Sequence, residues 1–561
     1  MSKLSLFSLC TAVLSLLIGC TEPQQPNTMV IENIQGYSFD NNRELFRFNA
    51  LAIKEGKVLA TGDAQLAAAY PDALKIDGQG KTLIPGIIDA HGHVSSLGYT
   101  LLSVDVRGLE TAQQAAEKVA DYARQQPQLQ WIRGRGWNQV LWPDQQFPSA
   151  ALLDSLIDDR PVWLERIDGH AGWANSAALR AAGINANTMS PAGGEILRDS
   201  DGNPTGVLID NAMSLVSQVI PNPGKAEIAL ALDAVSEHLL SLGITSTHDA
   251  GVNATEHQLY RELADSGGMK VRIYGMISST DPELKQILAA GHSRDSNDLY
   301  TARSIKIYTD GALGSHGAAL LEPYQDRPDH SGLLLTSEQQ LRQLFDQAIK
   351  AGFQIAIHAI GDKGNRIALD EFEYAFNSIG GRELRHRIEH SQVVAPEDIP
   401  RFKALDVIPS MQPTHATSDM NMAEERIGAE RLKGAYAWRS FLNQNSRLVS
   451  GSDFPVELAN PFDGIHAAVT RQNKQNQPPG GWIPQQAISI EETMRSFSID
   501  AAWAAHQEET LGGLSPGKWA DFILLDQDIY AIAPEDLWKT QVLETWLAGK
   551  RVFAAESAVT L

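Results

Sequence analysis

Residues 84–94 read IPGIIDAHGHV, and this stretch decides the fold. The apolar run from Ile84 to Ile88 has the composition of a buried strand. His91 and His93 follow it two residues apart, so on an extended chain their side chains point to the same face. Two imidazoles side by side at the end of a buried strand suit a metal ion such as Zn²⁺. Such a pair alone is a weak signal, because it also occurs by chance.

The first strand is followed by seven more apolar segments, each leading into helical or loop sequence. The clearest helix spans 337–352, with apolar residues at helical spacing and Gly352 as its stop. Eight β–α units predict an α/β fold, a TIM-like (β/α)8 barrel, with a long insertion at about 105–235 after the first strand. The predicted strands are 83–91, 243–250, 270–277, 303–311, 353–361, 384–392, 406–415 and 446–454.

Both ends of the chain are rich in short strands separated by turn residues. This pattern of short strands and turns covers residues 30–83 and 506–561, whereas residues 84–505 hold the alternating strands and helices. The pattern predicts one small β-sandwich domain that is built from both termini and attached to the barrel.

The first twenty residues form a separate segment, in which Lys3 precedes an apolar run too short to span a bilayer comfortably. The run ends in Leu-Ile-Gly-Cys, which resembles a bacterial lipobox, where the cysteine becomes lipidated and starts the mature chain. A cleaved signal or an anchor helix is the alternative. We expect a lipoprotein signal peptide at 1–20, lipidation at Cys20 and a membrane-anchored protein of the cell envelope. Thr21 implies outer-membrane sorting if the host is Gram-negative.

Cysteine use sets a limit on the rest of the chain. The protein has 2 Cys, Cys10 and Cys20, and both lie in the leader. Past the polar tether at 21–29, no thiol remains to form a disulfide or bind a metal. Any metal site there must use His, Asp, Glu or Lys.

Charge excludes one class of partner. The formal net charge is -22, and a field of that sign repels phosphate backbones, so we expect no nucleic acid partner. A chain of 561 residues can bury one large core together with an accessory domain. The oligomeric state is not predicted.

Metal-binding residue types recur at the carboxyl ends of the predicted strands. In a closed barrel these ends converge on one face, where such enzymes place their sites. Each residue alone has a simpler interpretation, as a core histidine, a turn cap or an ion-paired lysine. Together they form a nitrogen and oxygen donor set suited to Zn²⁺ and permissive of Mn²⁺, Co²⁺ or Fe²⁺. The residues are His91, His93, Lys306, His358, His390 and Asp453.

The motifs IPGIIDAHGH, SIKIYTDGALGSHGAAL, IAIHAIGD, RIEH and SGSDFPV resemble those of the amidohydrolase superfamily of metal-dependent hydrolases. The resemblance is greatest to its amidohydrolase-3 branch, which includes N-substituted formamide deformylases and is related to D-aminoacylases. It covers nearly the whole chain after the leader. The motifs are specific for the family and for metal chemistry, and weakly specific for the substrate.

The resemblance implies a role for each ligand. The two histidines of the first strand would bind the more buried metal together with Asp453, and His358 and His390 would bind a second metal. Lys306 would bridge the two metals as a carbamate formed with CO₂. An ordinary lysine beside a single metal is the alternative.

The expected reaction is hydrolysis of a carbon–nitrogen bond other than a peptide bond, in a small N-acyl or N-formyl amide. A bound Zn²⁺ lowers the pKa of water to about 7, so hydroxide is available to attack the carbonyl carbon. Asp453 would take the proton as general base and pass it to the leaving nitrogen as general acid. His170, in the insertion, is a further catalytic candidate that could donate to the oxyanion, with a structural turn histidine as the alternative.

Five residues near the strand ends are candidates for substrate contact. Asp310 and Gly311 follow Lys306 at the end of the fourth strand, and His316 lies in the loop after them. For His316 a solvent-exposed role is equally open. Gln412 and His415 follow the seventh strand and could reach the same pocket.

Two other functions stay open. The same site could hydrolyse an ester, a lactone or a cyclic imide instead of an amide. The chain could also be a surface lipoprotein that binds a ligand without turnover, although a pure binder has no evident need for a full ligand set with a base. The exact substrate, the metal and the number of metals are not predicted.

Overall fold

The computed structural model describes residues 28–139, 142–166, 171–191, 194–221, 223–314 and 316–556. The predicted signal peptide with Cys20, and His170 of the insertion, lie outside these residues. The predicted tether ends too late, because Thr28 and Met29 already belong to strand β1 (Thr28–Glu32) and pair with a neighbouring strand. Among the described helices, none has the length and apolar character needed to cross a membrane.

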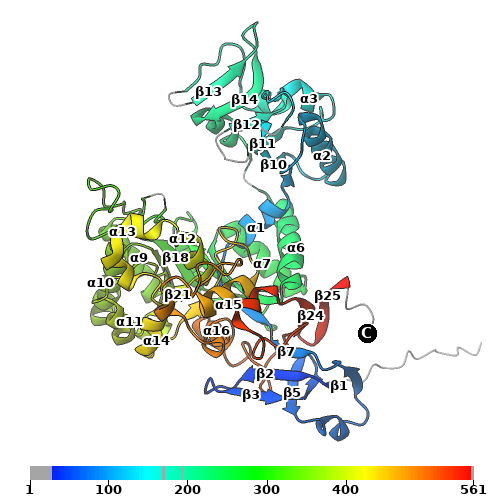
Figure 1. The fold of residues 1–561 in the computed structure, drawn as a ribbon, viewed down its shortest axis with the longest axis vertical. Helices are drawn as coiled ribbons and strands as arrows, with labels where there is room; N and C mark the ends of the chain where they lie inside the picture. Colours follow the sequence, from blue (N-terminus) through cyan, green and yellow to red (C-terminus); the bar gives the residue numbers. More distant parts are fainter. Residues whose placement is uncertain are drawn as a thin grey trace, which may run out of the picture.

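Eight parallel strands form a nearly closed barrel, which confirms the predicted TIM-like barrel (Figure 1). The backbone N–H of Asp453, after the last strand, donates to the carbonyl oxygen of His91 in the first at 2.7 Å. The N–H of His93 donates to the carbonyl of Phe454 at 2.8 Å. These bonds join the two ends of the sheet. Each strand overlaps one predicted segment: β8 (Ile87–Gly92), β15 (Ile244–Val252), β16 (Arg272–Ser278), β18 (Tyr300–Tyr308), β19 (Gln354–Ala359), β20 (Arg387–His390), β21 (Ile408–Met411) and β22 (Val449–Ser450).

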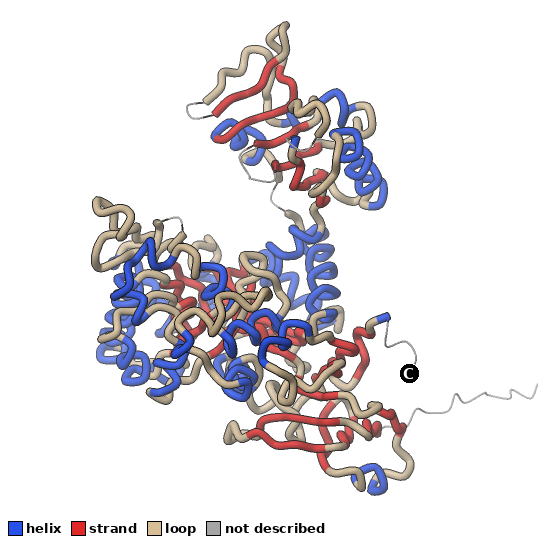
Figure 2. The backbone as a smooth tube through the Cα atoms, viewed as in Figure 1, coloured by secondary structure: helices blue, strands red, loops and turns tan. Residues whose placement is uncertain are grey.

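Helices surround the barrel strands, as Figure 2 shows. The helix predicted after the fourth strand is α9 (Glu338–Lys350), with Leu341 and Phe345 on its buried face. Ser337 caps its first turn, and Gly352 takes a left-handed φ of 77° just past its end. The other helices that follow barrel strands are α1 (Val94–Leu101), α7 (Ala254–Ser266), α8 (Leu284–Ala290), α10 (Asp362–Ser378), α11 (Ile399–Leu405), α12 (Pro413–Asp419), α13 (Ala423–Arg431), α14 (Trp438–Asn443), α15 (Pro461–Thr470), α16 (Ile490–Ser496) and α17 (Ile499–Ala504).

The stretch predicted as one strand at 83–91 is two strands that serve different sheets. Strand β7 (Thr82–Pro85) pairs outside the barrel, and β8 begins only after Gly86. A side chain at Gly86 would overlap Thr245, whose own Cβ lies 2.8 Å from the position that a Gly86 Cβ would take. The glycine therefore lets the chain pass close to strand β15 as it changes sheets.

Two further sheets pack beside the barrel, and one of them combines both ends of the chain (blue and red in Figure 1). The six-stranded sheet has the order β25-β24-β23-β7-β2-β3, and the four-stranded sheet has the order β5-β4-β1-β6. They share an apolar core in which the rings of Phe522 and Trp546 stack 5.3 Å apart. The strands not yet given are β2 (Gln35–Phe39), β3 (Leu45–Phe48), β4 (Ala50–Lys54), β5 (Lys57–Gly62), β6 (Leu74–Asp77), β23 (Phe522–Leu525), β24 (Val542–Leu547) and β25 (Lys550–Ala554).

The segment after α1 builds a third sheet, in a lobe that projects from the barrel at the top of Figure 1. The buried rings of Trp137, Trp142 and Trp173 contact one another in its core. Its elements are β9 (Val104–Asp105), α2 (Ala112–Gln125), β10 (Ile132–Trp137), α3 (Ala150–Asp154), β11 (Val162–Arg166), β12 (Ala171–Ala174), α4 (Ser176–Ala181), β13 (Gly194–Arg198), β14 (Pro204–Asp210) and α5 (Ser214–Ser217).

The insertion ends earlier than predicted. Helix α6 (Lys225–Ser241) packs on α1 and on the barrel strand β15, so the predicted boundary near 235 falls inside a barrel helix. Leu232, Val235 and Leu239 are buried on its inner face at helical spacing. That spacing is the same in helices of the insertion and of the barrel, so it does not mark the boundary.

Replacing Gly86 with alanine should lower the stability of the fold, because the new methyl group overlaps Thr245, which is itself buried. We expect a loss of about 1–3 kcal/mol in unfolding free energy, measured by denaturant unfolding. Gly314→Ala is the matched control, since its Cβ would meet only the end of Met422 at 3.6 Å. Equal midpoints for the two variants would contradict a steric requirement at Gly86.

Candidate metal centre

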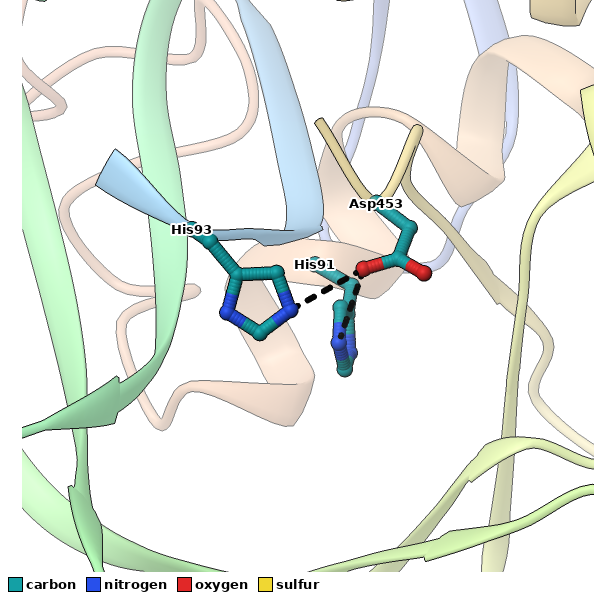
Figure 3. A group of neighbouring side chains, drawn as sticks. All are labelled: His91, His93 and Asp453. Carbon is teal, nitrogen blue, oxygen red and sulfur yellow. Dashed lines mark ion pairs between the residues drawn. The ribbon is translucent and has the colours of Figure 1, made fainter. Parts of the chain in front are cut away.

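The first and last barrel strands bring two histidines and a carboxylate together. His91 ends β8, His93 caps helix α1, and Asp453 follows β22. The side chains point toward one another in Figure 3. The Oδ1 atom of Asp453 lies 3.1 Å from Nε2 of His93 and 3.6 Å from Nε2 of His91. One ligand atom from each residue lies within 4.8 Å of the other two, which is a spacing that one metal ion can bridge.

A second group uses the other oxygen of the same carboxylate. Ligand atoms of His390, His415 and Asp453 also lie within 4.8 Å of one another. His390 ends β20, and His415 lies in α12 after β21. Nε2 of His415 is 3.6 Å from Oδ2 of Asp453. His415, which the sequence proposes for substrate contact, is therefore grouped with the candidate metal ligands.

Lys306 and His358 complete the cluster. Lys306 is buried in strand β18, and its Nζ lies 3.0 Å from Nε2 of His91. The ring of His358, in β19, lies 4.5 Å from that of His390 between centroids. The structure thus brings all six predicted ligands to the carboxyl ends of the barrel strands, while their role in binding metal stays a prediction.

The protonation states favour metal ligation. Burial lowers the pKa of His91 to about 4 and that of His358 to about 3, and it holds the pKa of His390 well below its usual range. These imidazoles are therefore neutral at pH 7, which is the form that binds a metal. Burial raises the pKa of Asp453, but the nearby imidazoles, with His93 foremost, lower it more, so it lies well below its usual range. Burial lowers the pKa of Lys306 to about 8.

A buried ionic network fixes the orientation of His91. Its Nδ1 donates to Oε2 of Glu389 at 2.5 Å, which leaves Nε2 facing Asp453. Arg387 donates to Glu389 and lies 2.9 Å from Nδ1 of His248, and Ser410 donates to Glu389 at 2.7 Å. Glu389 and Arg387 are functional residues that the sequence motifs alone do not identify. The available signal was two opposite charges, two residues apart, in a strand expected to be buried.

Asp89 connects the first and last strands behind the cluster. Its carboxylate accepts from the backbone N–H of His91 at 3.0 Å. It also accepts from the N–H of Ser452 at 3.1 Å and from its hydroxyl at 2.7 Å. Ser452 is the residue before Asp453, so one carboxylate positions ligands from both ends of the barrel. The position of Asp89 in the sequence does not indicate this role.

The remaining predicted contacts differ in their surroundings. Asp310 is fully buried and accepts backbone N–H bonds from Ala319, Ile360 and Gly361, which argues against direct substrate contact. Gly311 donates its N–H to the carbonyl of Gly317 within the same loop.

His316 and Gln412 contact other protein groups. Nε2 of His316 lies 3.0 Å from a carboxylate oxygen of Asp326, at the half-buried base of the loop after β18. Oε1 of Gln412 accepts from Nδ1 of His390 at 2.8 Å, so Nε2 of that histidine is the ring nitrogen left for a ligand. Substrate contact by these residues stays a prediction.

The residues present fit a divalent metal. Nε2 of His358, Nε2 of His415 and Oδ1 of Asp453 are buried and have no hydrogen-bond partner among the described residues. Buried polar atoms are nearly always satisfied, so three unpaired donors and acceptors in one cluster indicate a missing partner. Imidazole nitrogens and a carboxylate oxygen form the ligand set of many catalytic zinc sites.

Comparisons with known proteins agree with this geometry. The sequence profile described as "Amidohydrolase family" matches residues 75–553. The protein LONG AFTER FAR-RED 3 of Arabidopsis thaliana is 35% identical over 92% of this chain and 90% of its own length. An N-substituted formamide deformylase of Arthrobacter pascens is 28% identical over 89% of this chain and 94% of its own.

A solved structure gives the same result for the fold. An uncharacterized metal-dependent hydrolase from Pyrococcus furiosus superposes with a TM-score of 0.75 at 29% identity, covering 89% of this chain and 99% of that one. The chain therefore belongs to the amidohydrolase family, and it is a hydrolase.

Proposed function

We propose that this hydrolase depends on one or two divalent metal ions, with Zn²⁺ favoured, and cleaves a carbon–nitrogen bond other than a peptide bond in a small N-acyl or N-formyl amide. The observation that carries the proposal is the convergence of imidazoles, one carboxylate and one lysine at the mouth of the barrel. The relative named N-substituted formamide deformylase supports an amide as the scissile group.

Two sets of residues would hold metal. His91, His93 and Asp453 form the first set. The second set is His390 with Asp453 and one more imidazole. The family resemblance assigns this place to His358. The distances to ligand atoms of His390 and Asp453 assign it to His415.

Lys306 is the residue whose chemistry must change for two metals to bind. Its Nζ lies 3.0 Å from the ligating nitrogen of His91, where an ammonium would repel a metal cation. Burial in the barrel already disfavours the charged form. The neutral amine can add to CO₂, forming an N–C bond and releasing a proton. The carbamate that results is an anion whose oxygens suit the same metals.

The metal, Asp453 and Glu389 would each have a separate role in the hydrolysis. A divalent metal held there would lower the pKa of water to about 7 and polarise the amide carbonyl. Asp453 takes the proton from the attacking water and delivers it to the leaving nitrogen as the C–N bond breaks. Its buried Oδ1 lies 3.1 Å from Nε2 of His93 and forms no hydrogen bond among the described residues, so it can take part in this transfer. Glu389 keeps the proton of His91 on Nδ1, so the Nε2 lone pair faces the site.

Asp453→Asn should keep the fold and lose the activity, because an amide side chain cannot accept and return the proton. On an N-formyl amine as substrate, we expect kcat to fall by about 10²- to 10⁴-fold. Formate release measures the rate, and an ester with the same leaving-group carbon skeleton tests preference for the amide.

Asp121→Asn is the control, since that carboxylate is exposed on the insertion. Near-normal kcat for Asp453→Asn would remove Asp453 from the mechanism. Faster turnover of the ester than of the amide by the wild-type enzyme would replace the proposed bond with an ester bond.

We infer further that Cys20 carries lipid and holds the enzyme at a membrane of the cell envelope. The support is the Leu-Ile-Gly-Cys sequence at the end of an apolar leader. Two or three acyl chains give stable anchoring, which a single chain does not.

Cys20→Ser should move the protein from the membrane fraction to the soluble fraction, because lipidation requires the thiol. Fractionation followed by immunoblotting measures the distribution. Cys10→Ser, in the apolar part of the same leader, should remain at the membrane. A membrane-bound Cys20→Ser protein with unchanged mobility would show that lipid is not the anchor.

A further inference from the structure

A cavity lies at the opposite end of the barrel from the metal centre. It has a volume of about 660 Å³ and is formed where strands β20, β21 and β22 begin. Arg385, Asp406 and Arg447 come from the segments just before those strands, Trp503 comes from α17, and Arg43 comes from the turn between β2 and β3. Segments far apart in the sequence thus converge on one space between the barrel and the six-stranded sheet.

The cavity is lined by cations in a chain that is acidic overall. Arg43 pairs with Asp500 and Arg385 with Glu508, each at 2.7 Å. The other lining charges are Arg382 and Lys403, which share the carboxylate of Asp406 at 3.3 and 3.5 Å, together with Glu383 and Arg447. Five cations therefore face four carboxylates, with Asp500 and Glu508 counted.

In the part of the chain that the structure describes, Arg447 forms no direct ion pair, although the carboxylates of Asp500 and Glu508 lie near enough to act on it. Among the described residues it has neither an ion pair nor a hydrogen bond, and its guanidinium rests 4.0 Å from the ring centroid of Trp503. The guanidinium of Arg385 lies 4.3 Å from the same ring. Burial lowers the pKa of Arg447, and the nearby carboxylates of Asp500 and Glu508 offset this only in part. A half-buried arginine on an aromatic ring presents its remaining N–H groups in a fixed orientation.

An unpaired hydroxyl lies beside this arginine. Ser446 is 5% exposed and lines the cavity, and its Oγ has no hydrogen-bond partner among the described residues. Asn445, with a left-handed φ of 59°, lines the cavity as well, as do Arg43 at 70° and Arg385 at 57°. Non-glycine residues rarely adopt this conformation, and such residues concentrate at functional sites.

We propose that this cavity is a binding site for a phosphate group, held by the guanidinium of Arg447 and the hydroxyl of Ser446. A phosphate group has three acceptor oxygens, so it can accept from the guanidinium of Arg447, the hydroxyl of Ser446 and the side-chain amide of Asn445 at once. The cavity is larger than a phosphate ion, so the group belongs to a larger molecule, either a soluble phosphate ester or an anionic lipid headgroup. The site is distinct from the metal centre and does not depend on the proposed reaction.

Inorganic phosphate is the first probe, tested on the full chain by thermal unfolding and titration calorimetry. We expect millimolar phosphate to raise the melting temperature of the wild-type protein, and Arg447→Gln to weaken phosphate binding at least about tenfold. Ser446→Ala, a small change in a buried position, should weaken it as well. Lys433→Gln removes one exposed positive charge elsewhere and should bind like the wild type.

The outcomes separate the sources of the anion and can reject the site. Sedimentation with phosphatidylglycerol vesicles that is lost in Arg447→Gln, with no binding to phosphatidylcholine vesicles, assigns a lipid headgroup. Phosphate binding without Arg447-dependent vesicle binding assigns a soluble ester. Absence of a phosphate effect in the wild type overturns the proposal. So does an unchanged effect in folded Arg447→Gln, which would place the anion elsewhere, for example at the metal centre.

Discussion

The hydrogen bond from the backbone of Asp453 to the carbonyl of His91 is the contact on which the site depends. It joins the last barrel strand to the first, and in the same step it sets a carboxylate beside two imidazoles that are distant in sequence. Asp89 reinforces the junction by accepting from the segments that carry both ligands. Closure of the barrel and assembly of the metal centre are therefore one structural event.

The charge states of the buried side chains favour the binding of a cation. Burial keeps His91, His358 and His390 neutral, and Asp453 stays ionised despite its burial. Behind them, Glu389 is held by Arg387 and Ser410 and accepts the proton of His91. Burying so many polar groups is unfavourable unless each finds a partner, and the atoms left unpaired at the centre are those that a metal would satisfy.

The sequence predicted the barrel well because all eight strands carry a dense apolar run, and five of them also carry a predicted metal ligand near the carboxyl end. The sequence-based prediction was wrong where a boundary is set by contacts between residues that are distant in the sequence. The run from Leu83 to His91 looks like one strand, and only the proximity of Thr245 shows that Gly86 must divide it. The insertion boundary failed because α6 has the same periodicity as the helices on either side.

The candidate site divides in the same way. The sequence motifs and strand positions predict His91, His93 and Asp453. The grouping of His415 with His390 depends instead on where helix α12 places His415. Asp310 looked like a pocket residue from its place after Lys306, yet its carboxylate is used by the backbone of the loop. Roles that depend on side-chain partners need the folded chain.

The most direct test of the central claim is the metal content of the purified chain, measured by inductively coupled plasma mass spectrometry after preparation with bicarbonate and without chelator. We expect about one to two divalent ions per chain, and loss of at least one in a folded protein that combines His91→Asn with His93→Asn. A chain that holds no divalent ion, even after dialysis against Zn²⁺ or Mn²⁺, would contradict a metal-dependent hydrolase.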